Sequence, residues 1–145
     1  MKLFKTTLLV CSFLIASLGT MHSQEMKVKK YDNPQWVRIG MVKFKPMMKE
    51  RAQAIINDYF MKADMALGNS GPTAFDMASG EYDMIVAFPM DQGVETLNYE
   101  MSPSDIDWMK ELAKLTGGQQ QAMAKLQEFY DMVDRWDSDI ARKLN

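Results

Sequence analysis

The segment that most constrains the fold is Gly71–Met90, GPTAFDMASGEYDMIVAFPM, which has the pattern of two β-strands joined by a turn. Glycine tolerates the positive φ that a type II′ turn requires at its first central position, so Gly80-Glu81 is predicted to be a two-residue loop that pairs Met77 with Met84. Period-two alternation then predicts a bulky face under helices and a second face of small or acidic side chains. The bulky face would comprise Phe75, Met77, Tyr82, Met84, Val86 and Phe88, and the second face Ala74, Asp76, Ala78, Asp83, Ile85 and Ala87.

Residues 1–23 have the pattern of a secretory signal peptide. Lys2 and Lys5 precede the apolar run Leu8–Leu18, which at roughly 11 residues is too short for a membrane-spanning helix of about 20. Cleavage is expected after Gly19 or after Ser23, and an uncleaved anchor is the alternative. The sequence therefore predicts a secreted or periplasmic protein.

Removal of this signal peptide also removes much of the common catalytic and metal-binding chemistry. Cys11 and His22, the only cysteine and the only histidine, are removed with it or lie at its edge. Without a thiol or an imidazole, the mature chain cannot be a cysteine protease, a Ser-His-Asp hydrolase, a usual zinc site or a histidine-ligated haem protein. Loss of Lys2 and Lys5 takes the formal net charge from −2 to −4, which disfavours nucleic-acid binding. We expect no cofactor, no metal ion, no nucleic acid and, after cleavage, no membrane association.

The rest of the chain is expected to form a polar leader over residues 24–35 and a single α+β domain over residues 36–145. Ser102-Pro103-Ser104-Asp105 predicts a helix start, because serine caps the first turn, proline suits the first helical position and the aspartate completes a capping box. Gly40, in the middle of a strand, predicts a close backbone approach or a bulge. The expected elements are a strand over 36–45, a helix over 47–67, the hairpin, a possible short strand over 94–101, a helix over about 102–115 and a long helix over 119–144.

Asp137 is one candidate site residue. On a helical wheel of the expected last helix it lies in the apolar arc, between Val133 and Ile140. Burying a carboxylate costs several kcal/mol unless the charge is paired. Asp137 is therefore either a cavity-facing acid with a raised pKa, a candidate catalytic group, or a structural acid that pairs with an arginine or sits at an exposed helix end.

Asp76 and Asp83 form a second candidate on the small-residue face of the hairpin. In the predicted register they are diagonal neighbours about 7–8 Å apart, a separation that suits acid–base catalysis across a substrate. Arg38 is expected on the same face as a counter-charge or anion anchor. With Tyr82, these residues form the candidate ligand-binding set. The alternative is a solvent-facing sheet or an ion-paired dimer interface.

Methionine is abundant, at 15 residues, and thioether clusters can bind Cu(I) outside the cytoplasm. The close groupings are Met47-Met48 and the helical pair Met61 and Met65. No histidine supports them, so we interpret the methionines as adaptable core residues.

The order strand–helix–strand–strand–helix, punctuated by Pro46 and the turn at Gly80, resembles the ferredoxin-like domains of the dimeric α+β-barrel superfamily. The resemblance covers roughly Trp36–Leu115, and a long helix is expected where the family has its final strand. It implies a sheet of three or four antiparallel strands under helices, in small monooxygenase-like or ligand-binding domains that pair their sheets about a cavity.

Two functions remain open from the sequence. One is a non-enzymatic module that binds a small, partly apolar ligand or a protein partner, including a second copy of itself as a homodimer, on the face of Asp76, Asp83 and Arg38. The other is a cofactor-free enzyme that uses carboxylates with Tyr82 or Tyr99. An enclosed cavity with a carboxylate would favour the enzyme, and a flat face for another subunit would favour the module.

Overall fold

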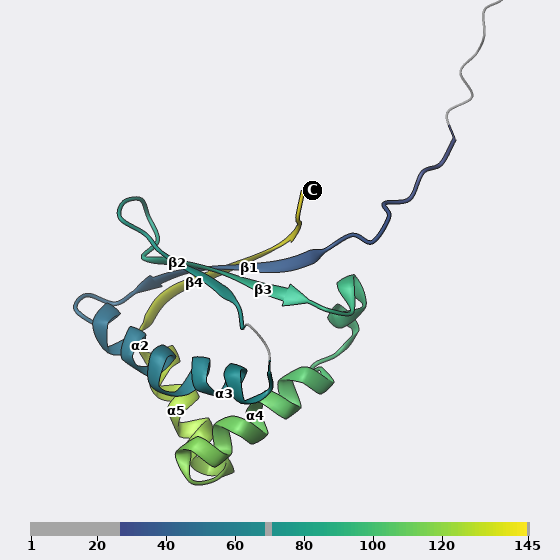
Figure 1. Ribbon diagram of the computed structural model, residues 1–145. Helices are drawn as coiled ribbons and strands as arrows, with labels where there is room; N and C mark the ends of the chain where they lie inside the picture. Colours follow the sequence, from purple (N-terminus) through teal and green to yellow (C-terminus); the bar gives the residue numbers. More distant parts are fainter. Residues whose placement is uncertain (1–26, 69–70, 145) are drawn as a thin grey trace, which may run out of the picture. The chain divides into compact units, whose positions relative to one another are not determined.

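The computed structural model describes residues 27–68 and 71–144. Asn33–Asn145 forms a compact unit that is separate from Met1–Asp32. Within this unit a four-stranded antiparallel sheet carries its helices on one side (Figure 1). The sheet order is β2-β3-β1-β4, with β1 at Trp36–Phe44, β2 at Thr73–Asp76, β3 at Met84–Met90 and β4 at Val133–Arg142. The predicted α+β, ferredoxin-like class is confirmed.

The helices follow the sequence signals closely. The segment predicted as a helix over 47–67 is helical, although its middle turn is a π-helix, and Gly68 follows it with a φ of +73°, the left-handed conformation that commonly ends a helix. The helical elements are α2 (Lys49–Ile55), the π-helix η1 (Ile56–Phe60), α3 (Met61–Ala66), the 3-10 helix η2 (Gly93–Asn98), α4 (Pro103–Thr116) and α5 (Gln119–Asp131).

The start of α4 has the predicted capping box. Asp105 donates its backbone N–H to Ser102 Oγ at 3.2 Å, and Ser102 donates its backbone N–H to Asp105 Oδ2 at 2.9 Å. Gly117 ends the helix with a φ of +92°. The possible strand over 94–101 does not form, because residues Gly93–Asn98 adopt the 3-10 helix η2.

Two apolar clusters hold the helices. In the first, Val42 and Phe44 of β1 pack against α2 and α5, where Phe44 meets the Phe129 ring edge-on at 6.1 Å between centroids. In the second, Ala63 of α3 packs against Leu112 of α4 and the N-terminal part of α5. The first cluster fixes α2 and α5 on the sheet, and the second joins α3, α4 and α5 to one another.

The helix predicted over 119–144 is shorter in the structure. It ends at Asp131, and Val133–Arg142 forms strand β4, antiparallel to β1. The apolar positions Val133, Trp136 and Ile140 fit helical spacing by coincidence. Pairing along the whole of β1 outweighs the low strand propensity of a segment with three aspartates, because strand preference depends strongly on the neighbouring strand. The final strand of the ferredoxin-like pattern is therefore present, and the expected departure of the C-terminal part from that pattern is corrected.

The predicted register of the hairpin is wrong by one residue. Phe75 pairs with Ile85, and Asp76 pairs with Met84. A shift by one moves every side chain of β2 to the other face. Phe75 therefore lies on the side of the sheet away from the helices, 54% exposed, while Met84 keeps its predicted place in the core.

The loop itself explains this shift. Met77 donates its backbone N–H to the carbonyl of Asp83 at 2.9 Å, which leaves residues 78–82 in the loop where a two-residue turn was predicted. Asp83 in turn donates its N–H to the carbonyl of Val42 at 2.9 Å and so continues the ladder with β1. Side chains of the wider loop bind β4, and these tertiary contacts replace the local turn preference of Gly80.

Gly40 has the close approach that its position in the strand predicts. A Cβ atom at Gly40 would lie 2.9 Å from Cζ2 of Trp136 and 3.1 Å from Cγ1 of Val86. Glycine thus lets the Trp136 indole lie against the backbone of β1. In the described part of the chain, none of the helices is long and apolar enough to span a membrane.

Candidate functional site

The side of the sheet opposite the helices is uncovered within the unit Asn33–Asn145 (Figure 1). We call this side the open face. The strand registers place on it Val37, Ile39, Met41 and Lys43 of β1, Thr73 and Phe75 of β2, Ile85, Ala87 and Pro89 of β3, and Arg135, Asp137, Asp139 and Ala141 of β4.

The centre of the open face is apolar. Ile39 and Met41 of β1 lie beside Ala87 and Ile85 of β3, and Phe75 of β2 extends this strip to the edge. None of these five side chains belongs to the two core clusters of the described residues. Val37, Ile39 and Met41 alternate along β1 and share the side that faces outward from the domain core. A contiguous apolar strip of this kind is typical of an interaction surface.

One end of the open face is polar and internally paired. Tyr82, from the loop between β2 and β3, donates its hydroxyl hydrogen to Asp137 Oδ2 at 2.5 Å. Arg135 Nε lies 2.7 Å from the same oxygen, Arg135 Nη1 lies 2.7 Å from Glu81 Oε1, and the guanidinium carbon is 5.5 Å from the centre of the Tyr82 ring. We call Glu81, Tyr82, Arg135 and Asp137 the loop–β4 cluster.

The contacts in this cluster shift the pKa values of Asp137 and Tyr82 in opposite directions, each farther from pH 7. The hydrogen bond from Tyr82, with the charge of Arg135, holds the pKa of the Asp137 carboxyl below its ordinary value. The same hydrogen bond raises the pKa of the Tyr82 hydroxyl. The predicted raised pKa of Asp137 is therefore wrong, and the structural alternative, an ion pair with an arginine, is confirmed. General acid–base catalysis requires pKa values near the working pH, so these shifts do not favour catalysis by either group.

The other candidate acids, Asp76 and Asp83, contact α2 and β1 respectively. Asp76 Oδ1 lies 2.7 Å from Lys49 Nζ and accepts a hydrogen bond from Gln53 at 3.3 Å. Asp83 Oδ2 accepts the backbone N–H of Phe44 at 2.8 Å. Both carboxylates raise the pKa of Lys49, mainly through its hydrogen bond to Asp76. Asp76 and Asp83 thus both act on Lys49, and their role as an acid–base pair remains a prediction.

Arg38 does not join them. It pairs with Phe88 and Ile140 across the sheet, four residues along β1 from Val42, and it lies on the helix side. The proposed ligand-binding set of Arg38, Asp76, Asp83 and Tyr82 is therefore divided among three places, and the roles of its members remain predictions.

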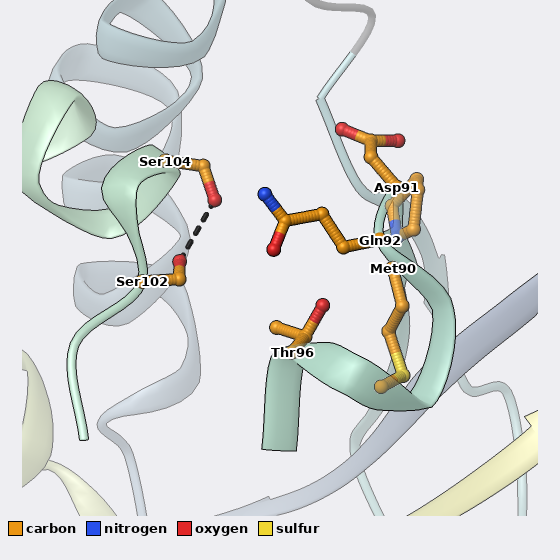
Figure 2. Close-up of a pocket in the computed structure, with 7 residues that line it drawn as sticks. Met90, Asp91, Gln92, Thr96, Ser102 and Ser104 are labelled. Atoms are coloured by element: carbon orange, nitrogen blue, oxygen red, sulfur yellow. Dashed lines mark hydrogen bonds between the residues drawn. The ribbon is translucent and has the colours of Figure 1, made fainter. Parts of the chain in front are cut away.

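A small polar hollow of about 120 Å³ lies between the end of β3 and the start of α4 (Figure 2). Two of its hydroxyl groups are already engaged, since Ser102 Oγ lies 2.8 Å from Ser104 Oγ and 2.7 Å from Asp105 Oδ2. Every buried side-chain nitrogen or oxygen of the described residues has a hydrogen-bond partner. The hollow therefore contains no buried polar side-chain atom that lacks a partner. It is lined by Pro89, Met90, Asp91, Gln92, Thr96, Ser102 and Ser104.

Asp64 on α3 is a titratable group that the sequence interpretation missed. Burial raises the pKa of its carboxyl, and a hydrogen bond from Trp108 of α4 offsets part of this effect. Its side chain also lies against Gly71, where a Cβ atom would be 3.3 Å from Asp64 Cβ. The sequence offered no signal for this site, because the contact joins two helices 44 positions apart. Across residues 27–68 and 71–144, no group of three or more acidic, histidine or cysteine side chains could hold a metal ion.

Comparison with known proteins identifies the fold. No protein-family model and no curated protein matches the chain. Among solved structures, a NIPSNAP family protein from Agrobacterium tumefaciens str. C58 has 11% sequence identity and a TM-score of 0.52, covering 82% of this chain and 94% of that one. A second NIPSNAP family protein of that organism, described as having unknown function, has 12% identity and a TM-score of 0.51, covering 80% and 94%. The chain thus shares the α+β fold of these two NIPSNAP family proteins.

Proposed function

We propose that this protein is a non-enzymatic binding module that associates with a second copy of itself through the open face. The observation that carries the proposal is the apolar strip of Ile39, Met41, Ile85, Ala87 and Phe75 on a sheet side that no helix of the unit covers. Covering such a strip removes apolar surface from water at about 25 cal/mol per Å². Closed two-fold dimers are the commonest arrangement by which one chain covers its own surface.

The sheet edges support pairing through the face in preference to the edge. At one edge β2 has only four residues, and at the other β4 carries charged side chains along its length. Short or charged edge strands are the usual protection against pairing with another chain. Association through the open face is also the arrangement that the superfamily resemblance implies.

The loop–β4 cluster is compatible with burial at such an interface. Asp137 is paired with Tyr82 and Arg135, and Arg135 is also paired with Glu81. Covering these groups would leave no single charge without a partner, which is the condition under which buried ion pairs are tolerated.

The cellular location is part of the proposal. A secreted or periplasmic protein should lose its signal peptide, and residues 1–26 lie outside the described part of the chain. Intact-mass measurement of the protein exported by a bacterial host should give a chain that begins after Gly19 or after Ser23. A chain that retains Met1 would contradict export with cleavage.

Two matched variants test the association. Phe75 on the open face and Met123 on α5 have side chains of equal exposure, 54%. Phe75→Lys should weaken dimerisation at least ten-fold, a change of about 1.4 kcal/mol, whereas Met123→Lys should leave it unchanged. Light scattering coupled to size exclusion, over a dilution series, gives the mass of each variant. Equal dimerisation of Phe75→Lys and the wild type would contradict the proposal.

A further inference from the structure

The helix side of the sheet is covered by α2 and α5 at one end, and Trp36 and Met90 at the other end lie beside η2. Along β1, the side chains of Val42 and Phe44 are buried under α2 and α5. Two residues before Gly40, on the same side, Arg38 is exposed. Its neighbour Ile140 on β4 is 40% exposed. The helices therefore leave the row of Phe88, Arg38 and Ile140 accessible.

Arg38 differs from Arg51 and Arg135, each of which forms an ion pair. Arg51 lies 2.6 Å from Glu128, and Arg135 pairs with Glu81 and Asp137. Arg38, in contrast, has no ion pair with any residue of 27–68 or 71–144, and its guanidinium carbon lies 5.2 Å from the centre of the Phe88 ring. A cation–π contact uses none of the five N–H donors of the guanidinium group.

The nearest neighbours of this cation along β1 and across the strands are apolar, and Arg142, the partner of Trp36 on β4, lies farther along the same side of the sheet. Trp36, two residues earlier on the same side of β1, lies against Gly93 of η2, with its Cδ1 atom 3.3 Å from the position of a Cβ there. Trp136 lies against Gly40 on the other side of Arg38. The site thus combines one available guanidinium group with aromatic and aliphatic side chains, which we call the Arg38 shelf: Trp36, Arg38, Phe88, Trp136 and Ile140.

We propose that the Arg38 shelf binds a small organic carboxylate with an apolar body. The carboxylate would accept hydrogen bonds from the guanidinium group, whose planar fork matches two carboxylate oxygens, and the body would lie on Phe88 and Ile140. The negative net charge of the chain favours a monoanion over a phosphate-rich ligand. The shelf lies on the opposite side of the sheet from the open face, so this inference does not depend on dimerisation.

Phenylacetate is a suitable probe, with acetate and the neutral phenylacetamide as comparisons. Isothermal titration of the purified protein should show binding of phenylacetate, with at least ten-fold weaker binding of both comparison molecules. Arg38→Met should weaken phenylacetate binding at least ten-fold, and Phe88→Ala should weaken it to a smaller extent. Arg51→Met, which removes an exposed arginine from α2, should bind as the wild type does. Circular dichroism melting curves identify any variant that fails to fold.

Three results would overturn the inference. An absence of phenylacetate binding up to millimolar concentration would show that the Arg38 shelf is not a binding site for such carboxylates. Equal affinity in Arg38→Met and the wild type places the site elsewhere. Equal affinity for acetate and phenylacetate shows that the apolar side chains contribute nothing. Because dimer mass is measured separately with the Phe75→Lys variant, failure here leaves the proposed association untouched.

Discussion

Tyr82 donates a hydrogen bond of 2.5 Å to Asp137 and thereby ties the loop between β2 and β3 to the edge strand β4. The two residues are 55 positions apart, and β4 is otherwise joined to the sheet through β1 alone. The contact closes one end of the open face and holds β2, β3 and β4 in one arrangement. The loop that carries Tyr82 is the wide loop over residues 78–82, and the strand register that goes with this loop places Phe75 on the open face.

Tyr82→Phe should destabilise the protein modestly and in a pH-dependent way. The hydrogen bond holds the pKa of Asp137 below its ordinary value, so its stabilising effect is present above the unfolded-state pKa of the carboxyl. The effect is lost as the pH falls through the lower folded-state pKa. Thermal unfolding should show a lower Tm for the variant at pH 7, with the difference disappearing as the pH approaches 2. A difference that stays constant over this range would show that the hydrogen bond does not act through ionised Asp137.

Asp64→Asn should have the opposite pH dependence. Burial raises the folded-state pKa of Asp64, so the favourable effect of its proton is present at low pH and is lost as the pH rises through that value. Asparagine keeps an oxygen that can accept the Trp108 hydrogen bond and avoids burial of a charge. The variant should therefore gain Tm relative to the wild type at pH 7 and lose that gain near pH 3. Asp58→Asn, at an exposed position on η1, is the matched control, and the same gain there would assign the effect to overall charge.

Gly40→Ala should destabilise the domain by about 1–3 kcal/mol, the usual cost of overpacking. The added methyl group would meet the Trp136 ring at 2.9 Å. In a Trp136→Leu background the same change should cost less, because the smaller side chain can move away from β1. Urea unfolding of the two single variants and the double variant gives the coupling free energy. Additive effects would show that the close contact does not limit residue 40.

Local signals in the sequence were sufficient for several elements. The capping box at Ser102 and the strand that begins at Trp36 each depend on residues close in the chain, and both form as predicted. The tight contact at Gly40 was also predictable, because a glycine inside a strand needs a packing reason. What the sequence could not show was the partner, Trp136, which lies on a strand that was expected to be helical.

The errors arise where distant contacts outweigh local pattern. Val133–Arg142 has apolar residues at helical spacing and little strand propensity, yet pairing with β1 makes it a strand. The hairpin loop gives up its two-residue turn because Asp83 continues the ladder with β1 and Tyr82 binds Asp137. These two corrections also rearrange the candidate site. Asp137 moves from a helix to the open face, and Arg38 is separated from Asp76 and Asp83.

The most direct test of the account is sedimentation equilibrium of the wild-type protein over a hundred-fold range of concentration at neutral pH. The account predicts a reversible monomer–dimer equilibrium, with a limiting mass of twice the chain and no larger species, because two-fold association through the proposed surface closes at two copies. A single monomer mass at every concentration would contradict it, since the apolar strip would then remain exposed to water and would need another explanation.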